Sequence, residues 1–274
     1  MPNISIYFRK NIAIPQDHGS WVFIFSPLLI GLVAGRNISA ASMALIIAAI
    51  AAFLVRQPIT MAIKAYSGRR PRTDLPAARF WMVIYGIIIL LSIGELVMLG
   101  ELPVLYLAVP AAPVFAWHLW LVSRREERKQ AGIEILATGV LALAAPAAYW
   151  IGRGSYVVDG WLLWLLCWLQ SSASIVYAYL RLEQREWQTA PNGTEKVKAG
   201  RRALLYTWIN LLVCFGLGMA KIIPTLVWLA FLVQALEAVW GTFKPAIGTR
   251  PVAVGLRQLF VSILFTVIFV IFWR

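Results

Sequence analysis

The sequence predicts an all-α fold, in which residues 1–274 form a single membrane domain of nine transmembrane helices. Three observations predict it: the composition, the length of the apolar runs, and the placement of basic residues between those runs. The chain is 61% hydrophobic and 14% charged, whereas soluble domains are about 45–50% apolar and about 25% charged. A soluble surface needs charged residues that this chain lacks. The composition therefore excludes a soluble enzyme, a disordered chain and a secreted disulfide scaffold.

Each apolar run is long enough to cross a bilayer as a helix. Such a helix needs about 20 mostly apolar residues and satisfies its own backbone hydrogen bonds in lipid. The predicted spans lie at about 20–36, 39–57, 80–99, 102–122, 132–151, 160–180, 203–220, 223–241 and 255–273. The first two are joined only by Gly35-Arg36-Asn37, which predicts a helical hairpin.

The basic residues predict the orientation. With the N-terminus in the cytoplasm and the C-terminus outside, 21 Lys and Arg residues fall on the inner side and four on the outer side. Cytoplasmic loops collect Lys and Arg, so this asymmetry supports nine alternating spans with this orientation. The net charge of +13 then indicates membrane lipids as partners. It does not indicate nucleic acid, because no aromatic-basic repeat accompanies it.

Two connections on the inner side are longer than the rest, residues 65–79 and 182–202. Backbone in such loops is free to build a site, so we expect the functional face to be cytoplasmic. The spans before these two loops end alike, with Arg56 and Arg181 comparably placed. This similarity suggests an internal repeat, about 15–122 and 132–241, followed by a final helix at 255–273.

The inner end of the second span carries a dense cluster of cations. Arg56, Thr60 and Lys64 are spaced four residues apart, so they share one helix face. The following loop adds Arg69, Arg70 and Arg72. Guanidinium groups bind phosphate or carboxylate oxygens in bidentate fashion, which makes these residues candidates for holding an anionic headgroup or diphosphate. Snorkelling of long basic side chains into the interface explains the same pattern, and both interpretations stay open.

The inner end of the sixth span carries a polar stripe, Gln170, Ser174, Tyr177, Arg181 and Gln184. The intervals of four, three, four and three residues keep these side chains on one helix face. A polar face of a membrane helix should point into the bundle or into a cavity, because lipid cannot satisfy it. The stripe therefore predicts the wall of a substrate cavity or a set of interhelical hydrogen bonds.

Three ionisable residues are candidates for proton transfer or catalysis. Asp17 and His18 lie just before the first span, where they also suit helix capping. Glu237 lies within the eighth span, and a carboxylate there needs a partner, for which an Arg of the inner clusters is the natural choice. Zinc-ligand spacing, a nucleophile elbow and a phosphate-binding glycine loop are missing from the sequence, so we expect neither a metal site nor a cofactor.

Several stretches resemble the YwiC-like family of bacterial membrane proteins. They are PQDHGSW at 15–21, FLVRQP at 53–58, APAAY at 145–149 and KPAIG at 244–248. The resemblance covers most of the chain and implies a multi-pass protein of the bacterial cytoplasmic (inner) membrane. It supplies no catalytic residues.

A remoter, architectural resemblance is to the UbiA-type intramembrane prenyltransferases, which also have nine helices and long inner loops after the second and sixth. That resemblance implies aspartate-rich motifs in these loops, which hold magnesium and a prenyl diphosphate. This sequence departs from the pattern, because the first loop has one acid, Asp74, among arginines. Magnesium requires carboxylate and phosphate oxygens, so magnesium-dependent prenyl transfer is not expected.

Three functions remain open on the sequence alone. The leading one is binding of an amphiphilic anion, an isoprenoid or lipid phosphate, from the inner leaflet, with or without its modification. In it, Arg56, Lys64 and Arg181 converge on the anion between the second and sixth helices. The second is proton-coupled transport through Glu237 and His18. The third is a non-catalytic subunit of a membrane complex. The sequence leaves the oligomeric state undefined.

Overall fold

The computed structural model describes residues 7–15, 18–126 and 131–273, and every regular element within them is a helix. The short helices are α1 (Lys10–Ala13), η2 (His18–Trp21), η3 (Arg72–Asp74), α5 (Leu102–Leu105) and η4 (Tyr106–Ala108). The longer ones are α2 (Val22–Gly35), α3 (Ala40–Tyr66), α4 (Leu75–Met98), α6 (Ala111–Arg124), α7 (Ala131–Ala142), α8 (Ala144–Arg153), α9 (Asp159–Gln184), α10 (Gly193–Met219), α11 (Trp228–Phe243) and α12 (Pro251–Phe272).

The helices confirm a polytopic, all-α membrane bundle. Within the described ranges, seven helical segments are long and apolar enough to cross a membrane, and Gly19–Gly35 and Trp228–Phe243 are shorter apolar helices. Each of the nine predicted apolar runs coincides with one helix or with consecutive helical pieces. The second run continues past its predicted end to Tyr66, so Arg56, Thr60 and Lys64 do share one continuous helix.

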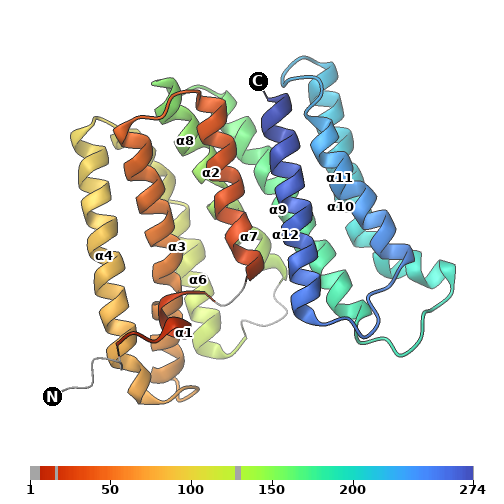
Figure 1. Ribbon diagram of the computed structural model, residues 1–274, viewed down its shortest axis with the longest axis horizontal. Helices are drawn as coiled ribbons and strands as arrows, with labels where there is room; N and C mark the ends of the chain where they lie inside the picture. Colours follow the sequence, from red (N-terminus) through yellow and green to blue (C-terminus); the bar gives the residue numbers. More distant parts are fainter. Residues whose placement is uncertain (1–6, 16–17, 127–130, 274) are drawn as a thin grey trace.

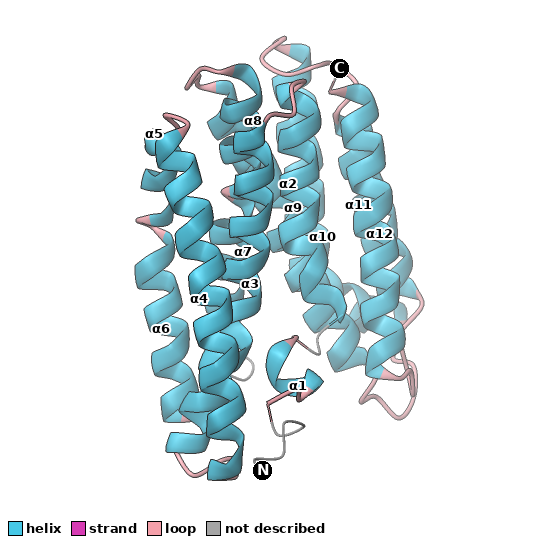
Figure 2. Cartoon of the chain, turned by 60° about the vertical axis from the view of Figure 1, so that its left-hand side comes forward, coloured by secondary structure: helices cyan, strands magenta, loops and turns pink. Residues whose placement is uncertain are grey.

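Successive long helices run up and down the bundle, and α1 and the end of α12 lie at opposite ends of it (Figure 1). Helices α3, α4 and α6 form one side of the bundle, and α10, α11 and α12 form the other. Helices α2, α7, α8 and α9 lie between them in both views (Figure 2). Helix α3 packs mainly on α4, whereas α9 packs on α7, α8, α10, α12 and α11.

Helices α2 and α8 approach each other closely at a stripe of small residues. Gly31 and Gly35 are four residues apart, and a Cβ added at Gly31 would lie 2.2 Å from the Ala145 carbonyl oxygen. A Cβ at Gly35 would lie 3.1 Å from Gly152 Cα. Small residues at this spacing let membrane helices pack backbone to backbone. The contact fixes α2 against the part of α8 that leads into α9.

The fifth predicted span is broken in the middle, between α7 and α8. Pro146 has no N–H to donate to Ala142, and the Leu143 N–H bonds to Val140 O at 3.1 Å in place of Gly139 O. Trp164 of α9 donates its indole N–H to the Gly139 carbonyl at 2.9 Å, and Trp168 donates to Ile135 O at 2.8 Å. Trp164 therefore satisfies the carbonyl that the break leaves without its helical donor, as membrane helices require.

Candidate functional site

A pocket of about 400 Å³ lies between the end of α9, the turn after α11 and the start of α12. We call it the Arg181 pocket. Trp240 forms part of its wall, and its charged and polar lining residues are Tyr177, Arg181, Lys244, Thr249, Arg257 and Gln258. The α9 residues come from the polar stripe of the sixth predicted span.

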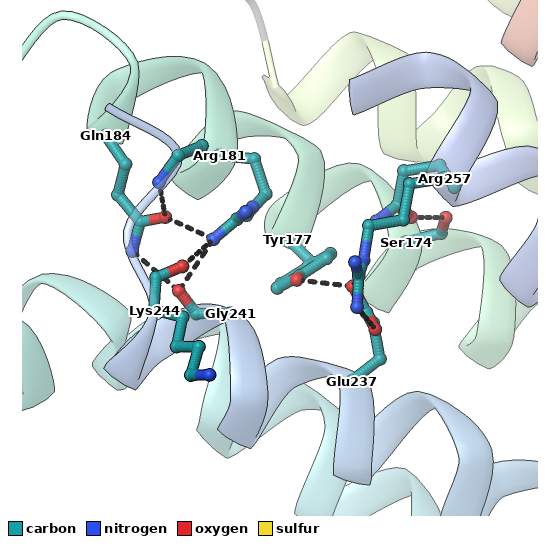
Figure 3. Close-up of polar contacts among 10 residues, drawn as sticks. Ser174, Tyr177, Arg181, Gln184, Glu237, Gly241, Lys244 and Arg257 are labelled. Carbon is teal, nitrogen blue, oxygen red and sulfur yellow. Dashed lines mark hydrogen bonds and ion pairs between the residues drawn. The ribbon is translucent and has the colours of Figure 1, made fainter. Parts of the chain in front are cut away.

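Arg181 is buried at the base of this pocket and holds the end of α11. Its Nη1 donates to Gln184 Oε1 at 2.8 Å, Gly241 O at 2.9 Å and Lys244 O at 2.7 Å. The last carbonyls of a helix have no intrahelical donor, and a cation there also suits the helix dipole. Gln184 Nε2 donates to Gly241 O at 3.0 Å as well (Figure 3). The inner end of α9 thus caps α11.

Glu237 and Arg257 form the charged pair of the pocket. Arg257 Nε lies 2.5 Å from Glu237 Oε1 and its Nη2 lies 2.8 Å from Oε2, a bidentate arrangement. Tyr177 donates its hydroxyl to the same carboxylate at 2.7 Å (Figure 3). The guanidinium carbon of Arg257 lies 3.5 Å from the centroid of the Trp240 ring. The expectation that Glu237 has an Arg partner from the inner clusters is confirmed.

The polar stripe of α9 faces the interior, as the spacing predicts: Gln170, Ser174, Tyr177, Arg181 and Gln184 are all buried. Toward the middle of the bundle the stripe makes hydrogen bonds to α12, from Ser174 Oγ to Gln258 Oε1 at 2.8 Å and from Gln170 Nε2 to Ser262 Oγ at 3.3 Å. Only Tyr177 and Arg181 of the stripe line the pocket. The stripe thus makes interhelical hydrogen bonds in the middle of the bundle and lines a pocket at the inner end of α9.

Arg56, Thr60 and Lys64 do not line the Arg181 pocket. They lie on α3, whose neighbours are α4, α6, α8 and α2, on the other side of the bundle (Figure 2). Thr60 is buried, and the guanidinium carbon of Arg56 lies 5.2 Å from the centroid of the Phe53 ring. The expected convergence of Arg56 and Lys64 with Arg181 is not found, because helix packing puts other elements between them.

The loop arginines of the first cluster have structural partners. Asp74 is buried and accepts from Arg9 Nη1 at 2.6 Å and Arg70 Nε at 3.1 Å. Arg69 Nη1 donates to Val122 O at 2.8 Å, which ties this loop to the end of α6. Arg72 is exposed. Asp74 thus holds Arg70 of the loop and Arg9 of the N-terminal segment.

The N-terminal candidates are only partly described. Asp17 lies outside the described residues. His18 begins η2, and its side chain lies outside what the structure describes. Their contribution to a site stays a prediction.

A second and larger pocket, of about 820 Å³, lies at the opposite end of the bundle, and no motif in the sequence pointed to it. We call it the Arg153 pocket. It is lined by residues of α2, α8, α9 and α12 and of the α10–α11 turn. Its charged residues are Arg36, Arg153 and Asp159, with Tyr149 donating to Asp159 Oδ2 at 3.3 Å. These residues are far apart in the sequence. The only signal that could have grouped them is that few charged residues lie on the predicted outer side.

The fold defines a multi-pass, all-α membrane protein with a pocket at each end. Residues 14–149 match the sequence model of the YwiC-like protein family, so this region of the chain is similar to that family. It is 26% identical over 167 residues to a protein of Bacillus subtilis (strain 168) named "Uncharacterized protein YwiC". That similarity covers 58% of this chain and 61% of the relative, so less than two thirds of the relative's length is matched.

No solved structure matches this chain, so the architectural resemblance to UbiA-type enzymes gains no support. The family match covers α2 to most of α8 and includes Arg56, Thr60 and Lys64. The Arg181 pocket is built by residues 177–258, beyond the matched region.

Proposed function

We propose that this chain is a nine-span protein of a bacterial cytoplasmic membrane, with its N-terminus in the cytoplasm, that binds a phosphate-bearing amphiphile in the Arg181 pocket. The distribution of 21 inner and four outer basic residues supports the sidedness. The two shorter helices fit a crossing as well. At 1.5 Å per residue, the 16-residue α11 is about 24 Å long, close to the hydrocarbon thickness that a bilayer reaches by local thinning.

One observation carries the ligand proposal: the pocket holds more positive charge than its acid neutralises. Arg257 is paired with Glu237, but within the described residues the hydrogen-bond partners of Arg181 are all neutral oxygens. Lys244 adds a further cation to the lining. A buried charge without a counter-ion is costly in a low-dielectric environment. An anion in the pocket would remove that cost.

The surroundings of the pocket suit an amphiphile. Trp240, Pro245 and Val254 give it apolar walls. Phe243 and Val252, which adjoin lining residues in the chain, are exposed on the outside of the bundle. An acyl or isoprenoid tail can lie along that lipid-facing surface while the headgroup reaches the cations. In the proposed orientation, the headgroup lies at the cytoplasmic end of the membrane.

The proposed function is binding of the amphiphile, without chemical modification of it. Glu237, which contacts the lining residues Arg257 and Tyr177, is engaged by Nε and Nη2 of Arg257 and by the Tyr177 hydroxyl, so it is not poised as a free base. Arg56, Thr60, Lys64, Arg69, Arg70 and Arg72 form a separate region, for which we propose only contact with lipid headgroups at the inner surface.

Native mass spectrometry of the purified protein with dioleoyl phosphatidic acid tests this proposal. Lys244→Gln removes one pocket cation without touching the Arg181 bonds, which use the Lys244 backbone. We expect about a tenfold weaker affinity, the value of one lost charge-assisted hydrogen bond. Lys198→Gln, an exposed lysine on the same predicted side, is the matched control. Equal affinities of Lys244→Gln, Lys198→Gln and the unmodified protein would contradict the proposal.

A further inference from the structure

The Arg153 pocket lies on the same two helices as the Arg181 pocket. Near their cytoplasmic ends, α9 and α12 supply Tyr177 and Gln258 to the Arg181 pocket. Near their other ends, the same helices supply Leu162 and Val270 to the Arg153 pocket. Helices α9 and α12 pack against each other. The two pockets therefore lie above one another along a single helix pair.

Both pockets carry the same kind of lining. The Arg153 pocket has two cations, Arg36 and Arg153, against one acid, Asp159, together with apolar walls that include Leu29 and Val270. Only four basic residues of the sequence fall on the predicted outer side, and two of them line this pocket. An excess of positive charge beside apolar surface suits the same anionic, apolar-tailed ligand class at both ends.

A buried polar seam runs from the Arg181 pocket into the bundle. It starts at Gln258, which lines that pocket and accepts from Ser174, and continues through the Gln170–Ser262 hydrogen bond. It ends at Ser26 of α2, which lies 2.5 Å from Thr266 Oγ1. All six side chains are buried. Gln258 and Thr266 are eight residues apart on α12, so the seam extends about 12 Å along this helix.

The seam has unused hydrogen-bonding capacity at its middle. Gln234 of α11 donates from Nε2 to the Gln170 carbonyl at 3.1 Å. Its Oε1 is buried and has no hydrogen-bond partner among the described residues. An unpaired buried amide oxygen is costly. It marks a point where a polar guest, a water molecule or a hydroxyl of a headgroup, would be stabilised.

An apolar layer closes the seam on the side of the Arg153 pocket. Phe265 and Phe269 of α12 are fully buried, with ring centroids 5.6 Å apart, and Leu163 of α9 is fully buried too. Phe269 stacks on Trp273, which lines the Arg153 pocket, at 5.3 Å between centroids. Thr266 and Val270 are one turn apart, so the layer is about 6 Å thick along α12.

We propose that the Arg153 pocket is the outer site of a translocation route. A phosphate-type oxyanion bound at the Arg181 pocket moves along the polar seam and passes the Phe265–Phe269 layer, which acts as the gate. This inference rests on the proposed function, because it takes its ligand from the Arg181 pocket. It assigns the two outer arginines to substrate binding and the aromatic layer to gating.

Reconstituted vesicles test the route. The probe is acyl-labelled fluorescent phosphatidic acid in phosphatidylcholine vesicles, with dithionite added outside to quench the outer leaflet. We expect quenching to reach the inner-leaflet probe only when the protein is present. In Arg36→Gln/Arg153→Gln the rate should fall about tenfold while phosphatidic acid binding at the Arg181 pocket is retained. Arg36→Lys/Arg153→Lys, which keeps both charges, should restore most of the rate.

A second variant examines the seam itself. Ser262→Phe fills it, and translocation should stop while binding is retained. A parallel experiment with inorganic phosphate trapped inside the vesicles distinguishes a free ion from a lipid headgroup as the substrate. Release of phosphate supports the route for a free ion. Movement of the lipid probe supports it for a headgroup. Binding without translocation of either probe, or translocation unchanged in these variants, overturns the route and leaves the proposed function standing. If the unmodified protein does not bind phosphatidic acid at all, the proposed function is overturned instead.

Discussion

Arg257 lies over the face of Trp240, with its guanidinium carbon 3.5 Å from the ring centroid, while the same group holds the Glu237 carboxylate through two nitrogens. A guanidinium is planar, so one face can stack on an aromatic ring while the edge binds a carboxylate. This relationship joins α11 to α12 at the entrance of the Arg181 pocket. It also makes Glu237 the point on which the geometry of the entrance depends.

Glu237→Gln should therefore destabilise the fold. The substitution leaves Arg257 without its counter-ion, and since the Arg257 side chain is 42% exposed, solvent screening limits the loss to about 1 kcal/mol. Thermal unfolding in detergent measures it. The double variant Glu237→Gln/Arg257→Gln should recover part of the loss, because no unpaired charge remains. A double variant less stable than the sum of both single variants would refute the pairing.

Gly31→Leu should disrupt the contact of α2 with α8. Even the Cβ would lie 2.2 Å from Ala145 O, and overpacking of this kind costs about 1–3 kcal/mol or more. Gly86→Ala is the matched control, because nothing lies within 4 Å of a Cβ added there in α4. That variant should be neutral or slightly stabilised. The measurement is the midpoint of thermal unfolding. An unaffected Gly31→Leu protein would mean that α2 and α8 do not touch at this site.

Trp164→Phe should destabilise the break between α7 and α8. It removes the donor to Gly139 O and leaves that carbonyl unpaired, at a cost of about 1–3 kcal/mol. Trp161→Phe, on the same helix but 46% exposed, should cost less. Chemical unfolding curves of both variants compare the two positions. Equal losses would show that the indole N–H of Trp164 contributes nothing beyond its bulk.

The connection between α8 and α9 should respond to high pH. Partial burial and a 2.8 Å hydrogen bond to Glu101 raise the pKa of Tyr156 to about 12. The unfolded pKa is about 10. The stabilising contribution is therefore complete below about pH 10 and is lost as the pH rises toward 12. Difference absorbance of tyrosinate between the unmodified protein and Tyr156→Phe measures this ionisation. The difference signal between the two proteins reports Tyr156 alone. If its midpoint lies near pH 10, the hydrogen bond to Glu101 is ruled out.

The helical segments could be predicted from the sequence, and so could the face of α9 that points into the bundle. Apolar run length follows from the bilayer thickness, and the spacing of Gln170, Ser174, Tyr177, Arg181 and Gln184 follows from helix geometry alone. The Arg partner of Glu237 followed from the cost of an isolated charge in the membrane. The Gly31-to-Gly35 spacing and Pro146 were also readable as signals of close packing and of a helix break.

The grouping of sites could not be predicted in the same way. Which helices touch depends on the packing of side chains across the whole bundle, and a charge pattern on one helix does not reveal its neighbours. The expectation that Arg56 meets Arg181 assumed that the second and sixth spans adjoin, whereas α3 packs on α4 and α9 on other helices. The Arg153 pocket escaped detection for the same reason, because its residues come from five separate segments.

The three carbonyl bonds of Arg181 set a threshold for any ligand that recruits this guanidinium. An anion that draws it away must compete with Gly241, Lys244 and Gln184, and success would release the last turn of α11 from the end of α9. Occupancy of the pocket by such an anion and docking of α11 on α9 are therefore thermodynamically linked, because each changes the free energy of the other.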